Sequence, residues 1–151
     1  MSLRLILSDM DACMTATAEP SRTKVLICDD EPMISSVLQA ILCDFTVELV
    51  GSGREALKKL DTFVPDVILL DVEMRELNGH EVCRRIRANS QFQFVKIVFL
   101  SGNVTQADRM AGLDAGGNEY IAKPFSSEEL LSKISLLARQ KAAEEEERTA
   151  S

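Results

Sequence analysis

The sequence predicts an α/β fold in which five strands alternate with five helices around one parallel sheet. Short apolar segments with β-branched residues alternate with longer segments whose apolar residues recur at helical spacing. Connections long enough to hold a helix join parallel strands, so helices are expected on both faces of the sheet. The 151 residues, of which 46% are hydrophobic and 27% charged, suffice for one such domain with a buried core.

The first two strand and helix units follow Lys24 directly. Val25–Cys28 is apolar throughout, as expected of a strand buried on both faces. Pro32 suits the first turn of a helix, and Thr46–Val50 is predicted to be the second strand, closed by glycines at Gly51 and Gly53. The two helices are marked by apolar residues at helical spacing, namely Ile34, Val37, Leu38, Ile41 and Phe45, then Ala56, Leu57, Leu60 and Phe63.

The third and fourth units have the same pattern. Val67–Leu70 is the third predicted strand, and a turn containing Gly79 leads into a helix. The buried side of that helix is expected to carry Val82, Cys83 and Ile86. Lys96–Leu100 is the fourth strand, and a short helix of weak apolar character is predicted over Gln106–Asp114.

The fifth unit begins with a predicted strand over Glu119–Ala122, after two consecutive glycines. Ser126 is a good helix cap, and acidic residues follow it in the first turn, where they favour the helix dipole. The buried stripe of this helix is predicted to be Leu130, Leu131, Ile134 and Leu137.

Changes in composition divide the chain into three parts. Residues 1–22 include a small, polar stretch and are predicted to be a mobile leader or linker. Residues 23–140 are predicted to be the folded domain. Residues 141–151 are expected to be an acidic helix end or a connector toward an output domain, because four consecutive glutamates lie there.

Five reactive side chains follow the ends of predicted strands. Right-handed crossovers leave few topologies, and we predict the flavodoxin-like (βα)5 fold with strand order 2-1-3-4-5. In such sheets the binding site lies at the carboxyl ends of the strands, near the point where the strand order reverses. Asp29, Asp30, Asp71, Ser101 and Lys123 are therefore expected to meet at one edge.

Three carboxylates and one ammonium at one edge indicate a site for a cation and a phosphoryl group. Each pair of like charges about 4 Å apart costs roughly 4 kcal/mol at an effective dielectric near 20. The site should therefore keep a proton or bind a cation, and hard oxygen ligands suit Mg²⁺. With the cation present, an Asp carboxylate can attack phosphorus, while Ser101 and Lys123 stabilise the transferred group.

Taken together, these motifs resemble the receiver (CheY-like) domain of a two-component response regulator over residues 24–138. The matching stretches are VLICDDEP (25–32), LLDVEM (69–74), Asn78-Gly79, IVFLSG (97–102) and DAGGNEYIAKPF (114–125). Each motif alone is weak, but their order and spacing together are specific. The resemblance implies a phosphoprotein of bacterial two-component signal transduction or a phosphorelay.

The resemblance also implies roles for the residues at the edge. Asp71 would be the phosphoacceptor that forms an aspartyl phosphate, and Lys123 would pair with the phosphoryl group. Asp30, Asp71 and the backbone carbonyl of Glu73 would hold magnesium directly, with Asp29 helping through water.

A second set of residues would respond to phosphorylation. Ser101 is similar in position to the switch hydroxyl of the family, and Tyr120 to its rotating aromatic. Glu73 and Asn103 occupy positions that tune dephosphorylation, so they are expected to modulate its rate. A cis peptide bond is expected before Pro124.

The implied function is a switch without turnover of an exogenous substrate: the domain would catalyse only its own phosphorylation and dephosphorylation. Its donor would be a sensor histidine kinase or a histidine phosphotransfer protein. The face formed by the helix at 106–114, the fifth strand and the last helix would then contact an output domain or target protein, or form a homodimer.

Composition narrows the remaining classes of partner and location. A net charge of −7 argues against direct binding of nucleic acid by this domain. No apolar run approaches a membrane span, and the apolar start is too short for a secretory signal, so a cytoplasmic protein is expected. The four cysteines and one histidine show no zinc-type spacing.

Two alternative functions remain beside the receiver interpretation. The chain could be a receiver-like interaction module that signals without phosphorylation. LILSDMDACMT resembles a phosphatase motif in which Asp9 would be the nucleophile and Asp11 the acid/base, although Cys13 breaks its pattern. His80 is expected to be a surface residue at a helix start.

Overall fold

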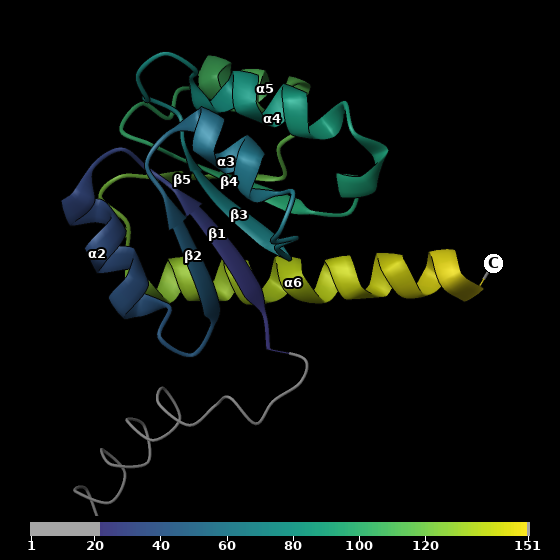
Figure 1. The fold of residues 1–151 in the computed structure, drawn as a ribbon. Coiled ribbons are helices and arrows are strands. Elements are labelled where there is room, and N and C mark those ends of the chain that lie inside the picture. The colour runs from purple at the N-terminus through teal and green to yellow at the C-terminus, as the bar shows by residue number, and fades with distance from the viewer. Residues whose placement is uncertain (1–21, 151) are drawn as a thin grey trace, which may run out of the picture.

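The described part of the chain forms one five-stranded parallel sheet with helices on both faces (Figure 1). The structure is a computed structural model that describes residues 22–150. The strand order is β2-β1-β3-β4-β5, which confirms the predicted flavodoxin-like topology. The strands are β1 (Lys24–Cys28), β2 (Thr46–Val50), β3 (Val67–Asp71), β4 (Lys96–Ser101) and β5 (Glu119–Ala122). The helices are α2 (Pro32–Ile41), α3 (Gly53–Lys59), α4 (Gly79–Arg87), α5 (Gln106–Asp114) and α6 (Ser127–Ala150).

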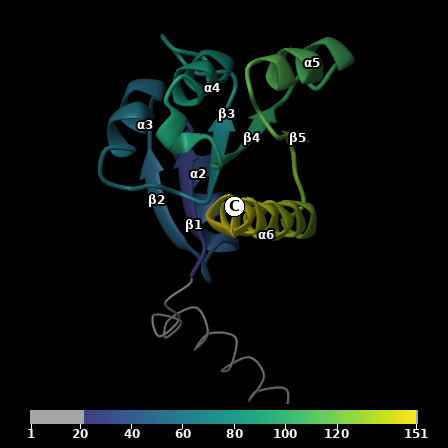
Figure 2. The ribbon, with the colours of Figure 1, turned by 90° about the vertical axis from the view of Figure 1, so that its right-hand side faces the viewer.

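The sheet divides the core into two layers. Helices α2 and α6 cover one face, and α3, α4 and α5 cover the other, as Figure 2 shows with the end of α6 toward the viewer. Alternate residues of a strand point to opposite faces of the sheet, and in the central strands both sets of residues are apolar. The α4 side of the core includes Leu26, Ile68, Leu70, Ile97 and Phe99, and the α6 side includes Ile27, Leu69, Val98, Leu100 and Ile121.

Several element ends differ from the sequence prediction. Helices α2 and α3 end at Ile41 and Lys59, although apolar spacing continues to Phe45 and Phe63. Both phenylalanines lie in the irregular segments beyond the helix ends and still pack against the core, so periodicity alone could not locate those ends. A 3-10 helix, Ser90–Phe92, was not predicted, because three residues are too few to show a period.

Helix α6 runs on through the segment after residue 140, for which an acidic helix end or a connector was expected. Two buried lysines attach its distal part to the amino-terminal end of the sheet. Lys96 Nζ on β4 lies 2.8 Å from both carboxylate oxygens of Glu144, and Lys141 Nζ lies 3.1 Å from Asp66 Oδ1. Helix α6 is therefore attached to the domain at Lys141 and Glu144, while most of the residues between and after them are exposed.

The N-terminal predictions and the membrane prediction have separate outcomes. The leader prediction for residues 1–22 falls almost wholly outside the described residues, as do Asp9, Asp11 and Cys13 of the alternative phosphatase motif. Among the helices of residues 22–150, none combines the length and the apolar character that a membrane crossing requires.

Candidate functional site

Three carboxylates meet at the carboxyl edge of the sheet. Asp29 follows β1 directly, Asp30 is the next residue, and Asp71 is the last residue of β3, the strand beside β1. Carboxylate oxygens from the three residues lie within 4.8 Å of one another. Asp29 and Asp71 are only 3% and 1% exposed, while Asp30 is half-buried. The strand order thus brings these residues together as the sequence predicted.

One ammonium group lies between two of these carboxylates. Lys123 follows β5, and its Nζ is 3.4 Å from Asp29 Oδ2 and 3.3 Å from Asp71 Oδ1. The peptide bond between Lys123 and Pro124 is cis, which confirms the expectation from the resemblance. One positive charge against three carboxylates leaves the cluster with an excess of negative charge.

Burial and this excess of negative charge both change the acidity of Asp71. Burial is the main cause that raises the pKa of Asp71 to about 7, and the neighbouring Asp29 charge raises it further. Lys123 and the Glu73 backbone N–H, which donates to Asp71 Oδ1 over 3.2 Å, act in the opposite direction. Asp71 is therefore a weaker acid than an ordinary aspartate.

The donor set fits a hard divalent cation. Several carboxylate oxygens, few other ligands and partial shielding from water are what Mg²⁺ selects, and cation charge would offset the repulsion that raises the pKa of Asp71. A shallow depression lined by Asp30, Gly51, Ser52, Arg75 and Glu76 opens beside the cluster.

Glu73 holds the Ser101 hydroxyl. Ser101 is the last residue of β4, and its Oγ donates to Glu73 Oε1 over 2.6 Å, with the Asn103 carbonyl as a second acceptor at 3.0 Å. The Asn103 amide Nδ2 lies 3.5 Å from the same Glu73 oxygen. Burial acts to raise the pKa of Glu73, but the Ser101 hydrogen bond and further contacts outweigh it and lower the pKa. Glu73 is therefore ionised and positioned over the edge.

Tyr120 and His80 form a contact that the sequence did not predict. The Tyr120 ring is 5% exposed, and its hydroxyl lies 3.1 Å from His80 Nε2. The prediction of His80 as a plain surface residue is therefore wrong: it does start α4, but its ring is half-buried against Phe99. Forty residues separate His80 from Tyr120, and no local sequence signal joins two such positions.

Comparison with known proteins agrees with this geometry. The family model described as response regulator receiver domain matches residues 25–135. The chain is 37% identical over 126 residues to the response regulator MprA of Mycobacterium ulcerans (strain Agy99), covering 82% of this chain and 53% of that protein. It is 34% identical over 125 residues to the transcriptional regulatory protein TrcR of Mycobacterium tuberculosis (strain ATCC 25618 / H37Rv), covering 82% and 48%. The chain thus spans about half the length of these curated relatives.

Solved structures show the same fold. The chemotaxis protein CheY4 of Vibrio cholerae aligns with a TM-score of 0.74 and 32% identity, covering 77% of this chain and 98% of that chain. The receiver domain of the sensor histidine kinase PA1611 from Pseudomonas aeruginosa PAO1 aligns with a TM-score of 0.72 and 33% identity, covering 78% and 98%. That structure has a magnesium ion coordinated in its active site cleft.

Proposed function

Because the chain belongs to the family of response regulator receiver domains, we propose that it is a phosphoryl-accepting switch with Asp71 as the acceptor. The observation that carries the proposal is the position of Asp71: it is buried among two other carboxylates and Lys123 at the carboxyl edge of the sheet. The donor is a phosphohistidine on a sensor histidine kinase or a histidine phosphotransfer protein.

The transfer is a single displacement at phosphorus. A carboxylate oxygen of Asp71 attacks the phosphorus atom, the bond from phosphorus to the donor imidazole breaks, and the leaving nitrogen keeps the electron pair and takes up a proton. Asp30, Asp71 and the Glu73 backbone carbonyl would hold Mg²⁺, with Asp29 helping through water. When bound, the cation supplies neutralising charge to the acceptor and the phosphoryl oxygens.

Lys123 and Ser101 stabilise the product. Lys123 Nζ, which already lies 3.3 Å from Asp71 Oδ1, pairs with a phosphoryl oxygen. The Ser101 hydroxyl has one proton to donate, so it must leave Glu73 before it can donate a hydrogen bond to the phosphoryl group. Phosphorylation thus exchanges one charge-assisted hydrogen bond for another and moves the end of β4.

The structural effect of phosphorylation reaches the face formed by α5, β5 and α6. Tyr120 on β5 packs against Phe99 on β4, the strand that ends at Ser101. In α5 only Gly112 is buried, so few apolar contacts hold this helix, which suits a displaceable element. We infer that this face contacts a downstream output domain or target protein, or a second copy of the chain.

Location and partner class follow from the same proposal. A switch that takes its phosphoryl group from a histidine kinase acts in the cytoplasm, and the acidic domain itself does not bind nucleic acid directly. Any output activity belongs to a partner or to a further domain.

Labelling with a small phosphodonor tests the proposal. With acetyl phosphate and Mg²⁺, the wild-type chain should gain the mass of one phosphoryl group by intact-protein mass spectrometry. Omitting Mg²⁺ or adding a chelator should reduce the label at least about tenfold, because the acidic cluster then remains uncompensated. A folded wild-type protein that takes up no label would instead favour the interaction module that signals without phosphorylation.

Removing the Glu73 carboxylate is expected to prolong the phosphorylated state. In Glu73→Ala the Ser101 hydroxyl loses its competing acceptor and is free to bond the phosphoryl group. Because this hydrogen bond is charge-assisted, we expect the decay of the phosphorylated form to slow by roughly three- to tenfold. The rate of label loss after donor removal measures it.

Two further variants test whether this effect acts through Ser101. Glu73→Gln keeps an acceptor without the charge, so its decay rate should lie between those of wild type and Glu73→Ala. In a Ser101→Ala background, Glu73→Ala should change the rate little. Equal decay in wild type and Glu73→Ala would contradict the proposed competition.

A further inference from the structure

The two proposed switch side chains, Ser101 and Tyr120, are in arrangements that belong to different states of the switch. Ser101 donates to Glu73, which is the arrangement expected before phosphorylation. Tyr120 nevertheless has its ring buried, which is the position that phosphorylation is proposed to favour. Some contact other than a phosphoryl group must therefore stabilise the inward ring.

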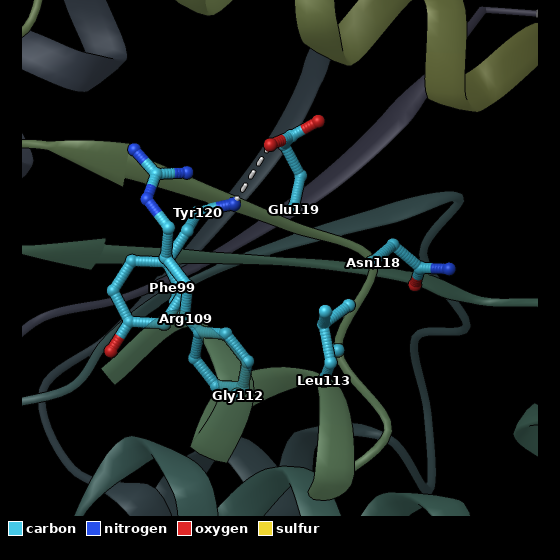
Figure 3. A pocket seen from close by; sticks show the side chains of 8 residues that line it. Phe99, Arg109, Gly112, Leu113, Asn118, Glu119 and Tyr120 are labelled. Atoms are coloured by element: carbon cyan, nitrogen blue, oxygen red, sulfur yellow. Dashed lines mark hydrogen bonds between the residues drawn. The ribbon is translucent and has the colours of Figure 1, made fainter. Parts of the chain in front are cut away.

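Helix α5 meets the Tyr120 ring at a glycine and at the wall of a cavity. A pocket of about 120 Å³ lies between α5 and β5, and the rings of Phe99 and Tyr120 line it (Figure 3). The α5 residue against the ring is Gly112, where even a Cβ atom would lie 2.7 Å from Tyr120 Cε2. The ring is thus bordered on this side by the Gly112 backbone and by a cavity that Arg109 and Leu113 of α5 also line.

Helix α4 supplies a specific contact at the tip of the ring. His80 Nε2 lies 3.1 Å from the Tyr120 hydroxyl, and the His80 ring meets Phe99 edge-on at 5.0 Å between centroids. Phe99 and Tyr120 are 5.3 Å apart, so three rings from α4, β4 and β5 form one cluster. Position 80 is the second residue of α4, which Asn78 caps, so its backbone is well fixed.

The protonation states suit a hydrogen bond between neutral groups. Burial lowers the pKa of His80, and the Arg84 charge lowers it further, while Asp108 and Glu73 act in the opposite direction. Burial also raises the pKa of the Tyr120 hydroxyl, with the Asp108 and Glu73 charges, while its contact with Ser101 and the Arg109 charge act in the opposite direction. A neutral imidazole has one acceptor and one donor nitrogen, so it can pair with a phenol in either tautomer.

We propose that His80 is a positioning residue that holds the Tyr120 ring inward by a hydrogen bond, so that the unphosphorylated chain already populates the inward state. This inference rests on the proposed function for its consequence, because the Tyr120 position matters only if it reports the switch. The typical strength of one neutral hydrogen bond changes the ratio of inward to outward ring by roughly two- to tenfold. Phosphorylation would then change the Tyr120 position less than in a chain without this bond.

The composition of the chain gives a direct readout. The sequence has one tyrosine and no tryptophan, so its intrinsic fluorescence above that of phenylalanine comes from Tyr120 alone. Quenching of this fluorescence by acrylamide measures how accessible the ring is to solvent. The experiment uses the full chain, before and after reaction with acetyl phosphate and Mg²⁺.

Two substitutions separate the hydrogen bond from ring packing. His80→Phe keeps a ring against Phe99 but loses the nitrogen, and His80→Gln keeps a polar group near the hydroxyl but loses the ring. The unphosphorylated His80→Phe variant should have a quenching constant at least about twofold above wild type, with His80→Gln near wild type. The opposite order, or equal quenching in wild type and His80→Phe, would overturn the proposal.

A second comparison measures the quenching of each protein after phosphorylation. Wild-type quenching should change little on labelling, whereas His80→Phe should become protected, because the phosphoryl group then replaces the lost bond as the force that keeps the ring inward. If neither protein takes up label, the proposed function fails, but the comparison of unlabelled proteins still decides the role of His80. A large loss of quenching on labelling in wild type would show that the ring is not already inward.

Discussion

Replacing Asp71 with Asn is expected to abolish phosphoryl labelling and, without Mg²⁺, to stabilise the protein at pH 8. In the proposed transfer the Asp71 carboxylate is the nucleophile, and an amide cannot replace it. The same carboxylate is buried beside Asp29, which raises its pKa from the ordinary 3.8 to about 7. Above pH 7 the folded protein must keep it charged against that repulsion, whereas the unfolded chain does so without cost.

The pH dependence of this effect has a defined sign. Because the folded-state pKa is raised, the native protein binds more protons than the unfolded chain between about pH 4 and 7, so its stability falls as pH rises through that window. The shift corresponds to an upper limit of about 4 kcal/mol, and we expect Asp71→Asn to gain about 2 kcal/mol at pH 8 because Asp29 and Lys123 share the effect.

Urea unfolding without metal measures this prediction. The difference between Asp71→Asn and wild type should shrink toward pH 4 and should also shrink when Mg²⁺ is added at pH 8, because the cation stabilises only the wild-type cluster. Asp61→Asn, at an exposed position, serves as a charge-matched control with little expected change. A stability difference independent of pH would contradict the raised pKa.

Gly79→Ala is expected to be the most destabilising small substitution in the site. The start of α4 passes so close to the end of β3 that a Cβ at position 79 would lie 2.5 Å from the Asp71 carbonyl oxygen and 3.0 Å from Val72 Cα. Both atoms belong to the backbone, and the Gly79 N–H also donates to the Val72 carbonyl over 3.1 Å. The backbone of Asp71 and Val72 cannot move away from this Cβ without shifting the Asp71 carboxylate.

We expect a loss of about 3 kcal/mol in the free energy of unfolding, together with a large drop in labelling by acetyl phosphate. Gly102→Ala is the matched control, since no heavy atom lies within 4 Å of its added Cβ. That variant should unfold within about 0.5 kcal/mol of wild type. A Gly79→Ala protein as stable and as readily labelled as wild type would show that α4 is not fixed against β3.

Sequence reasoning recovered the features that depend on local pattern and strand order. Apolar runs located all five strands, and the topology then placed Asp29, Asp30, Asp71 and Lys123 at one edge. These residues are predictable because each follows a strand, and parallel strands end on the same side of the sheet.

Side-chain pairing across distant elements was not predictable in this way. The bond from Ser101 to Glu73 and the bond between His80 and Tyr120 join residues 28 and 40 positions apart. Both depend on rotamers, and the second also depends on how closely α4 approaches the sheet; no periodicity encodes either property. The switching role of Tyr120 and the rate-modulating roles of Glu73 and Asn103 stay predictions.

The docking of α6 is a second case. Four glutamates near the end of the chain indicated a solvated helix end, yet one of them, Glu144, pairs with the buried Lys96. Lys96, at the start of the otherwise apolar fourth strand, was the available signal, because a buried ammonium requires a charged partner. The sequence did not show which acidic residue would reach it.

The position of the acyl phosphate tests the central claim most directly. The chain is labelled with acetyl phosphate and Mg²⁺, the aspartyl phosphate is reduced with borohydride, and the modified residue is located by peptide mass spectrometry. Conversion of Asp71 to homoserine, dependent on both donor and Mg²⁺, is the predicted result. Modification at Asp29 or Asp30 with Asp71 unchanged, or undiminished labelling of Asp71→Asn, would contradict the assignment of Asp71 as the phosphoacceptor.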